Sequence, residues 1–127
     1  MQRVISMDEA DDFARNWIAA FNTGDLALIL SHYAEEVELI SPIYLAFTEG
    51  RSDKVSGKAA LAGYFEMALA RYPELHFTLL EIARGTRSVC LRYHSNIGDR
   101  IAIECFERDA AGKAARVTCH YGIANPQ

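Results

Sequence analysis

The chain has 127 residues, of which 50% are hydrophobic and 24% are charged, with a formal net charge of -4. This length and composition predict a single domain, residues 1–127, that buries a core without disulfides or metals. The charges are spread along the sequence, so we expect neither a nucleic-acid partner nor a membrane partner. No secretory leader and no apolar run of spanning length are evident, which predicts a cytoplasmic protein.

The N-terminal part carries the pattern of a helical hairpin. A capping box at Ser6-Met7-Asp8-Glu9 predicts the start of a helix, and Asn22-Thr23-Gly24 predicts its end. Asp25 can then cap a second short helix that carries Leu28, Ile29 and Tyr33. Apolar residues spaced by three and four form one stripe on the first helix: Ala10, Phe13, Ala14, Trp17, Ile18 and Phe21.

The middle of the chain is less regular. Residues 37–41 predict a short strand that Pro42 ends, and residues 43–54 have no clear period, so we expect a loop or a ragged hairpin there. Ser56-Gly57 then precedes a third helix, which Pro73 stops. One face of that helix is apolar and is made of Leu61, Phe65, Ala68, Leu69 and Tyr72.

The remainder of the chain reads as strands. Four are predicted, at residues 76–83, 88–96, 100–108 and 114–122, with glycine-containing turns between them. Helices followed by a strand meander indicate an α+β fold.

Strand alternation sorts the two faces of the predicted sheet. If the turn near Gly98 has two residues, odd positions of one strand share a face with even positions of the next, whereas a three-residue turn would reverse the assignment. We assign the face with a single carboxylate among apolar neighbours to a pocket, and the mixed face to a subunit interface. The pocket face has Val89, Leu91, Tyr93, Ala102, Glu104 and Phe106, and the outer face has Cys90, Arg92, His94, Ile101, Ile103 and Cys105.

The cysteines and histidines do not form a recognisable metal or redox motif. The three cysteines lack C-x-x-C spacing, so we predict that they are reduced and structural; a Cys90–Cys105 bridge fits one register but is disfavoured in the cytosol. The four histidines are scattered, and neither glycine-rich nucleotide motif occurs. We therefore predict no metal and no cofactor.

Several segments together resemble one superfamily. Residues 17–25, Trp-Ile-Ala-Ala-Phe-Asn-Thr-Gly-Asp, are similar to the helix junction of ketosteroid isomerases and SnoaL-like polyketide cyclases, which are nuclear transport factor 2-like proteins. The similarity continues at residues 33–36, 56–60 and 109–122. It implies a cone-shaped, cystatin-like roll in which three helices pack on a curved antiparallel sheet. One fold hosts many functions, so the resemblance is more specific for the fold than for an activity.

Carried over by position, the resemblance also identifies changes in the expected chemistry. Trp17 stands at the position of the isomerase tyrosine donor, and Ser41 stands at the position of the general-base aspartate. Indole is a poor acid, and serine without a basic partner cannot remove a proton from carbon, so a standard steroid isomerase is not expected. Glu104 keeps an acid at the third position. The segment 43–55 is longer than the pattern, which favours a lid or an extra wall over the pocket.

Glu104 is the predicted catalytic residue. On an apolar face its pKa should rise through desolvation, although a purely structural carboxyl hydrogen-bonded to Tyr93 or Trp17 fits the same pattern. His94 and His120 are predicted on the outer face, unless a bulge turns His120 inward. The predicted substrate-binding residues are Trp17, Ser41, Tyr64, Tyr93, Phe106, Cys119 and Tyr121.

Two functions remain open. The first is an enzyme of isomerase, cyclase, dehydratase or hydrolase type, acting on a small apolar carbonyl, enol or epoxide compound in a closed pocket. The second is a ligand-binding or dimerisation module without turnover. A homodimer through the outer face is expected in either case, since Ile101 and Ile103 lie on it beside Cys90 and Cys105.

Overall fold

A computed structural model describes residues 4–123, so both ends of the predicted domain 1–127 lie outside the described residues. Four helices precede or interrupt the strands in this range. They are α1 (Met7–Thr23), α2 (Leu26–Leu30), α3 (Pro42–Phe47) and α4 (Lys58–Arg71). The strands are β1 (Tyr33–Ile40), β2 (Lys54–Ser56), β3 (Phe77–Arg84), β4 (Ser88–Ser95), β5 (Arg100–Arg108) and β6 (Ala114–Ile123).

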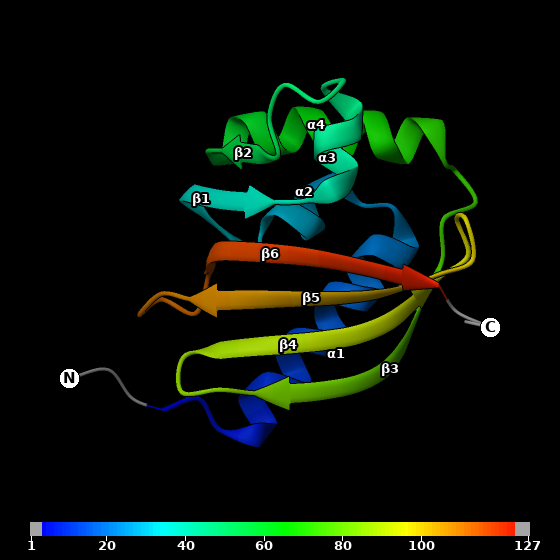
Figure 1. The fold of residues 1–127 in the computed structure, drawn as a ribbon. Coiled ribbons are helices and arrows are strands. Elements are labelled where there is room, and N and C mark those ends of the chain that lie inside the picture. The colour runs from blue at the N-terminus through cyan, green and yellow to red at the C-terminus, as the bar shows by residue number, and fades with distance from the viewer. Residues whose placement is uncertain (1–3, 124–127) are drawn as a thin grey trace.

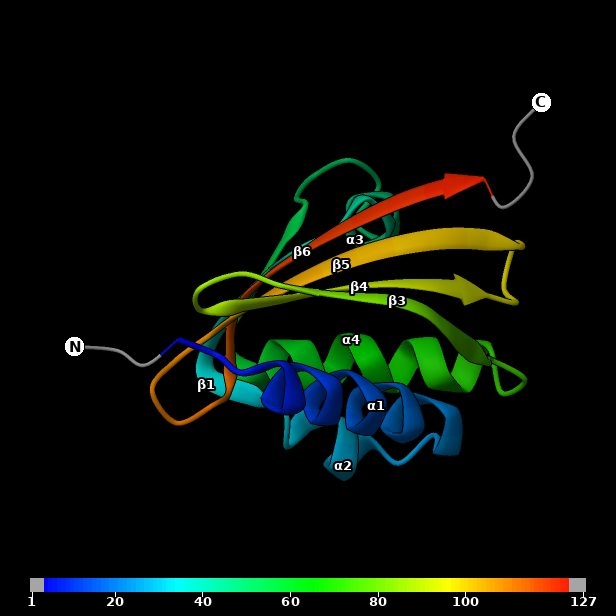
Figure 2. The same ribbon diagram turned by 90° about the horizontal axis from the view of Figure 1, so that it is seen from below.

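The six strands form one sheet in the order β2-β1-β6-β5-β4-β3. The long strands curve over α1 and α4, which lie on the same side of the sheet (Figures 1 and 2). This confirms the α+β roll of helices on a curved sheet. The sheet is antiparallel, as expected, except at one pair, where β1 runs parallel to β6.

Local sequence signals set the bounds of α1. The Ser6 side chain accepts a hydrogen bond from the Glu9 amide, and the Glu9 carboxylate accepts one from the Ser6 backbone N–H, which completes the capping box. At the other end Gly24 has φ 71°, a left-handed conformation that glycine adopts without steric cost. The predicted apolar stripe is buried throughout. These observations confirm the first helix.

The middle of the chain differs from the prediction in three places. Tyr33 begins β1 and does not belong to the second helix. Residues 42–47 form the helix α3, for which Ser41 is the N-cap and Pro42 the first residue. A proline suits this position because its missing N–H has no helical partner there. Residues 54–56 form the short edge strand β2, so the helical layer contains four helices instead of the predicted three.

The register of β4 and β5 confirms the predicted sorting of faces. Ser95 pairs with Arg100, Tyr93 with Ala102, and Leu91 with Glu104. The connection 96–99 therefore has an even number of residues, which keeps odd positions of β4 beside even positions of β5 on one face.

The prediction of reduced cysteines is wrong for two of the three. Cys90 and Cys105 face each other across β4 and β5 and form a disulfide, while Cys119 is free and buried. Direct cross-strand neighbours are close enough for this bond, with Cα atoms 4.0 Å apart. The Cys90–Cys105 bridge, which fits one register but was disfavoured from the sequence, is therefore the one that forms.

The core lies between α1 and the inner face of the sheet. Trp17 is at its centre and makes ring contacts with Phe21, Phe77, Tyr93 and Phe106. Offset and edge-to-face contacts of this kind stabilise a core beyond the area that they bury. None of the helices within residues 4–123 is both long and apolar enough to cross a bilayer.

Candidate functional site

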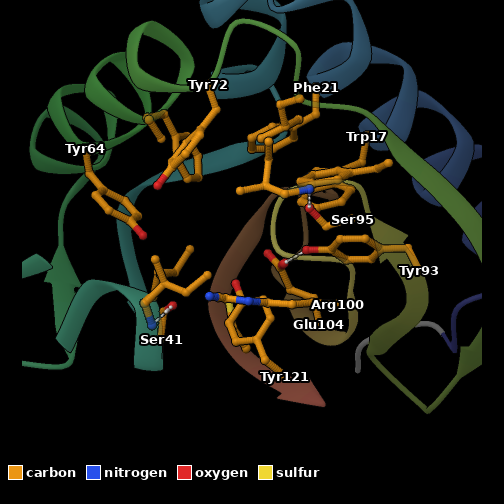
Figure 3. Close-up of a pocket in the computed structure, with 18 residues that line it drawn as sticks. Trp17, Phe21, Ser41, Tyr64, Tyr72, Tyr93, Ser95, Arg100, Glu104 and Tyr121 are labelled. Atoms are coloured by element: carbon orange, nitrogen blue, oxygen red, sulfur yellow. Dashed lines mark hydrogen bonds between the residues drawn. The ribbon is translucent and has the colours of Figure 1, made fainter. Parts of the chain in front are cut away.

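The inner face of the sheet leaves a pocket of about 130 Å³ beside the aromatic core. Figure 3 shows that its wall combines side chains of the helical layer with side chains of the strands. Most of these are apolar or aromatic, and Arg100 and Glu104 are the charged ones. The lining residues are Trp17, Phe21, Leu39, Ser41, Ile43, Tyr64, Phe65, Ala68, Tyr72, Leu75, Phe77, Tyr93, Ser95, Ile97, Arg100, Glu104, Cys119 and Tyr121.

Glu104 lies in the buried part of this wall, on β5 between Leu91 of β4 and Cys119 of β6. It is 4% exposed, and the Tyr93 hydroxyl donates a hydrogen bond of 2.7 Å to its Oε1 atom. Burial raises the pKa of Glu104 to about 7, while hydrogen bonding by Tyr93 and Cys119 opposes the rise. The carboxyl group is therefore poised to hold or release a proton near neutral pH.

Other weak acids around Glu104 stay protonated. Burial is the largest cause that raises the pKa values of Tyr93, Tyr121, Tyr64 and Cys119, and the negative charge of Glu104 raises them further. Their hydroxyl and thiol groups can thus orient a polar ligand as neutral hydrogen-bond partners, while Glu104 is the group that changes charge.

Trp17 lines the pocket, but its indole N–H is already used. Trp17 Nε1 donates a hydrogen bond of 2.9 Å to the hydroxyl of Tyr33, and both side chains are buried. The sequence offered Trp17 or Tyr93 as a partner for Glu104, and the structure provides Tyr93 in that role. Because Tyr33 was expected in a helix, this partner of Trp17 was missed.

Ser41 also has a structural task at the pocket wall. Its hydroxyl oxygen accepts hydrogen bonds from the amides of Ile43 and Tyr44, at 3.1 and 3.4 Å, and so caps α3. The side chain is 2% exposed. Ser41 thus anchors the segment 43–55, whose helix α3 contributes Ile43 to the pocket.

Phe106 is the one predicted lining residue that does not contact the cavity. It points to the same sheet face as Glu104 but packs against Phe13 and Trp17, with no exposed surface. Strand alternation assigns a face, but it does not say where along a strand the core ends and the cavity begins.

The histidines of the sheet lie away from the pocket, as alternation predicts. His94 Nε2 lies 2.6 Å from the Asp99 carboxylate, and exposed His120 contacts the Ile103 carbonyl through Nδ1. Neither lines the cavity, so no bulge turns His120 inward. Across residues 4–123 there is no cluster of three or more His, Cys, Asp or Glu side chains able to hold a metal ion.

The rim of the pocket was not anticipated from the sequence. Arg100 and Ile43 are exposed although they line the cavity, which is therefore accessible from this side and is not closed as expected. Tyr72, Ser95 and Ile97 also contribute. Strand alternation could have predicted that Arg100 lies on the pocket face, because Arg100, Ala102 and Glu104 are alternate residues of one strand.

Comparison with solved structures finds close relatives in shape. A SnoaL-like protein of unknown function from Burkholderia thailandensis E264 is 33% identical with a TM-score of 0.90, and the match covers 94% of this chain and 98% of that one. A protein with a cystatin-like fold from Methylobium petroleophilum PM1 is 18% identical with a TM-score of 0.74, over 98% of this chain and 81% of that one.

A third similar structure is SalBIII, an epoxide hydrolase/cyclase-like enzyme with a role in pyran ring formation in the polyether salinomycin. It is 18% identical with a TM-score of 0.72, and the match covers 91% of this chain and 92% of that one. A search of curated proteins finds no match. The family model of the SnoaL-like domain matches residues 14–125. The chain therefore belongs to the SnoaL-like domain family.

Proposed function

We propose that this protein is an enzyme that binds a small, largely apolar carbonyl, enol or epoxide compound and moves a proton on it through Glu104. The observation that carries the proposal is a buried carboxyl group with a pKa of about 7 in the wall of an aromatic pocket. A general acid or base works best when its pKa lies near the working pH.

The chemistry follows from the two forms of Glu104. The ionised form can remove a proton from the carbon beside a carbonyl, and the resulting neutral acid can return that proton to another carbon or to oxygen. The Tyr93 hydroxyl holds the carboxyl group in place through the 2.7 Å hydrogen bond. The apolar wall limits solvent around the negative charge that develops on the substrate. An isomerase or cyclase would need these steps, and the ring-forming SalBIII has the same fold.

The test uses proton exchange, because it requires no knowledge of the product. A panel of small cyclic and aromatic ketones is incubated with the protein in D₂O, and deuterium uptake next to the carbonyl is followed by NMR. We expect faster uptake for at least one compound, and a loss of 100-fold or more in Glu104→Gln.

The matched control is Glu107→Gln, which removes an exposed carboxylate from the opposite face of the same strand. This variant should retain the wild-type rate. Equal exchange rates in wild-type protein and Glu104→Gln would refute the role of Glu104.

A binding protein without turnover is the second candidate. Two observations favour it: the Trp17 indole N–H is donated to Tyr33, and the Ser41 hydroxyl oxygen accepts the capping hydrogen bonds of α3. Saturable thermal stabilisation by panel compounds, with no deuterium uptake and no product by NMR, would support this candidate over the enzyme.

We also propose that the protein forms a homodimer through the outer face of the sheet. Ile103 is 43% exposed there, beside Ile101, so the face offers apolar surface to a second copy. Light scattering at micromolar concentration should show a dimer, and Ile103→Lys should shift it to monomer. Met67→Lys, which alters an exposed methionine on α4, is the control and should remain dimeric. A wild-type monomer would contradict the proposal.

A further inference from the structure

The pocket has two chemically different ends. Glu104 is buried in its wall, whereas Arg100 lies on the exposed rim. We propose that the natural ligand is a one-ring organic acid, whose carboxylate binds Arg100 at the rim while a carbonyl or hydroxyl group at its other end reaches Glu104. This inference rests on the proposed function and names the class of substrate.

Arg100 is free to bind an anion. Within residues 4–123 its guanidinium forms no ion pair, and the neighbouring carboxylate of Asp99 is engaged with His94. The side chain is held close to Gly98, where an added Cβ atom would lie 2.9 Å from Arg100 Nε. Gly98 also has φ 73°, so the turn favours glycine and leaves room for the arginine.

The two charged residues are aligned along one strand. Arg100 and Glu104 both lie on β5, four residues apart, so both side chains belong to the inner face. At about 3.3 Å per residue their Cα atoms are about 13 Å apart. Both residues line the same cavity, and side chains stand roughly perpendicular to their strand, so a ligand that hydrogen-bonds to both spans a distance that matches one ring with a short acid arm.

The space between these residues is lined by rings. Tyr121 pairs with Ala102, halfway between Arg100 and Glu104, and Tyr72 faces the cavity from the end of α4 (Figure 3). Aromatic walls of this kind favour a flat or cyclic apolar body between two polar ends. A ligand with charge in its middle would lose hydration there without gaining a partner.

The volume of the pocket limits the ligand further. An engineered cavity of about 150 Å³ in another protein accommodates benzene, and the cavity here has about 130 Å³. One six-membered ring fills it. A four-ring steroid is larger than this volume, which agrees with the changes from the isomerase pattern at Trp17 and Ser41.

The experiment compares acids with their neutral esters. The probes are 4-hydroxyphenylacetate, 4-oxocyclohexaneacetate and 3-(4-hydroxyphenyl)propanoate, each with its methyl ester, and binding is measured by calorimetry at pH 7. We expect at least one acid to bind about ten-fold more tightly than its ester, because a hydrogen bond to a charged group contributes more than one to a neutral group. Added NaCl should weaken binding of the acid and leave binding of the ester unchanged, since the rim is exposed to solvent.

Arg100→Gln should abolish the difference between acid and ester and leave ester binding within two-fold. The matched control is Arg92→Gln, which removes an exposed arginine from the outer face of β4. This variant should change neither the difference between acid and ester nor the binding of the ester. Glu104→Gln should weaken acid and ester alike, which separates the two ends of the pocket.

Three results would overturn the ligand class. They are equal binding of acid and ester by the wild-type protein, equal loss of both in Arg100→Gln, and no binding of any probe at millimolar concentration. The proposed function would still stand in each case if the exchange assay on neutral ketones remained dependent on Glu104. If exchange did not depend on Glu104 but the protein still bound acids more tightly than esters, the protein would instead be a binding protein for acids.

Discussion

Two neighbouring regions of the inner sheet surface differ in what fills them. Around Phe106 the inner face of the sheet is close-packed, because Phe13 and Trp17 pack directly against the Phe106 ring. Around Glu104, two residues earlier on the same strand, it borders a cavity. The same alternation of side chains therefore places a core residue at one position and a pocket residue at the next.

The largest expected effect is a loss of stability when the close-packed region around Phe106 is disrupted. Phe106→Ala removes a fully buried ring from between Phe13 and Trp17, and we expect a loss of about 3–5 kcal/mol in the free energy of unfolding. Urea denaturation measures it. Phe47→Ala, which truncates a phenylalanine that is 46% exposed on α3, should cost less than 1 kcal/mol. Similar losses in both variants would contradict the contrast between core and surface.

The second prediction concerns the buried acid of the pocket region. The pKa of Glu104 is raised from 4.5 to about 7, so the native state holds this proton more tightly than the unfolded chain. This contribution to stability is complete below pH 4.5 and is lost as the pH rises through 7. It amounts to about 3 kcal/mol, at 1.36 kcal/mol for each pKa unit.

Glu104→Gln cannot ionise and should not show this loss. The free energy of unfolding of the variant, minus that of the wild type, should therefore increase by about 3 kcal/mol between pH 4.5 and pH 8. Denaturation at several pH values measures the difference. Glu107→Gln should show no such trend, and a flat difference for Glu104→Gln would mean that the carboxyl group is not desolvated.

A smaller effect is expected from the hydroxyl that contacts Glu104. Tyr93→Phe removes the donor of the 2.7 Å hydrogen bond, which lowers the pKa of Glu104. That pKa should therefore rise above 7, at a cost of about 1 kcal/mol in stability. NMR titration of the glutamate carboxyl signals would detect the rise. Tyr72→Phe removes a pocket hydroxyl that is not a partner of Glu104 and should leave the titration unchanged.

An effect of similar size concerns the wall that α3 adds to the pocket. Ser41→Ala removes the N-cap of α3 and should cost about 1 kcal/mol in the free energy of unfolding. Ser6→Ala, at the cap of α1, should cost a similar amount. Only the first variant should alter ligand binding in the calorimetric assay, because Ser41 lines the pocket and Ser6 does not.

Much of this fold follows from local signals in the sequence. The capping box at Ser6 and the apolar stripe predict α1, and alternation sorts the faces of β4 and β5 because the connection between them has an even number of residues. The helix α3 was missed although Ser41-Pro42 is a helix-start signal, since the same proline also reads as the end of a strand.

The candidate site was less accessible to such reasoning. Glu104 could be identified because a lone carboxyl among apolar residues stands out. The bond from Trp17 to Tyr33 joins separate elements, and the rim at Arg100 adjoins the turn 96–99, where Asn96 donates a hydrogen bond to the Glu74 carbonyl. Neither has a local pattern, because both are set by tertiary packing.

The parallel pairing of β1 with β6 has a consequence for folding kinetics. It joins Leu39 to Val117, and it brings the strand end at Ser41 beside the strand that carries Cys119 and Tyr121. Contacts between such distant parts of a chain require a large loop to close, which slows their formation relative to hairpins. The hairpins β3–β4 and β4–β5 can form first and set Tyr93 against Glu104. We therefore expect this polar pair to form before the opposite wall of the pocket encloses it.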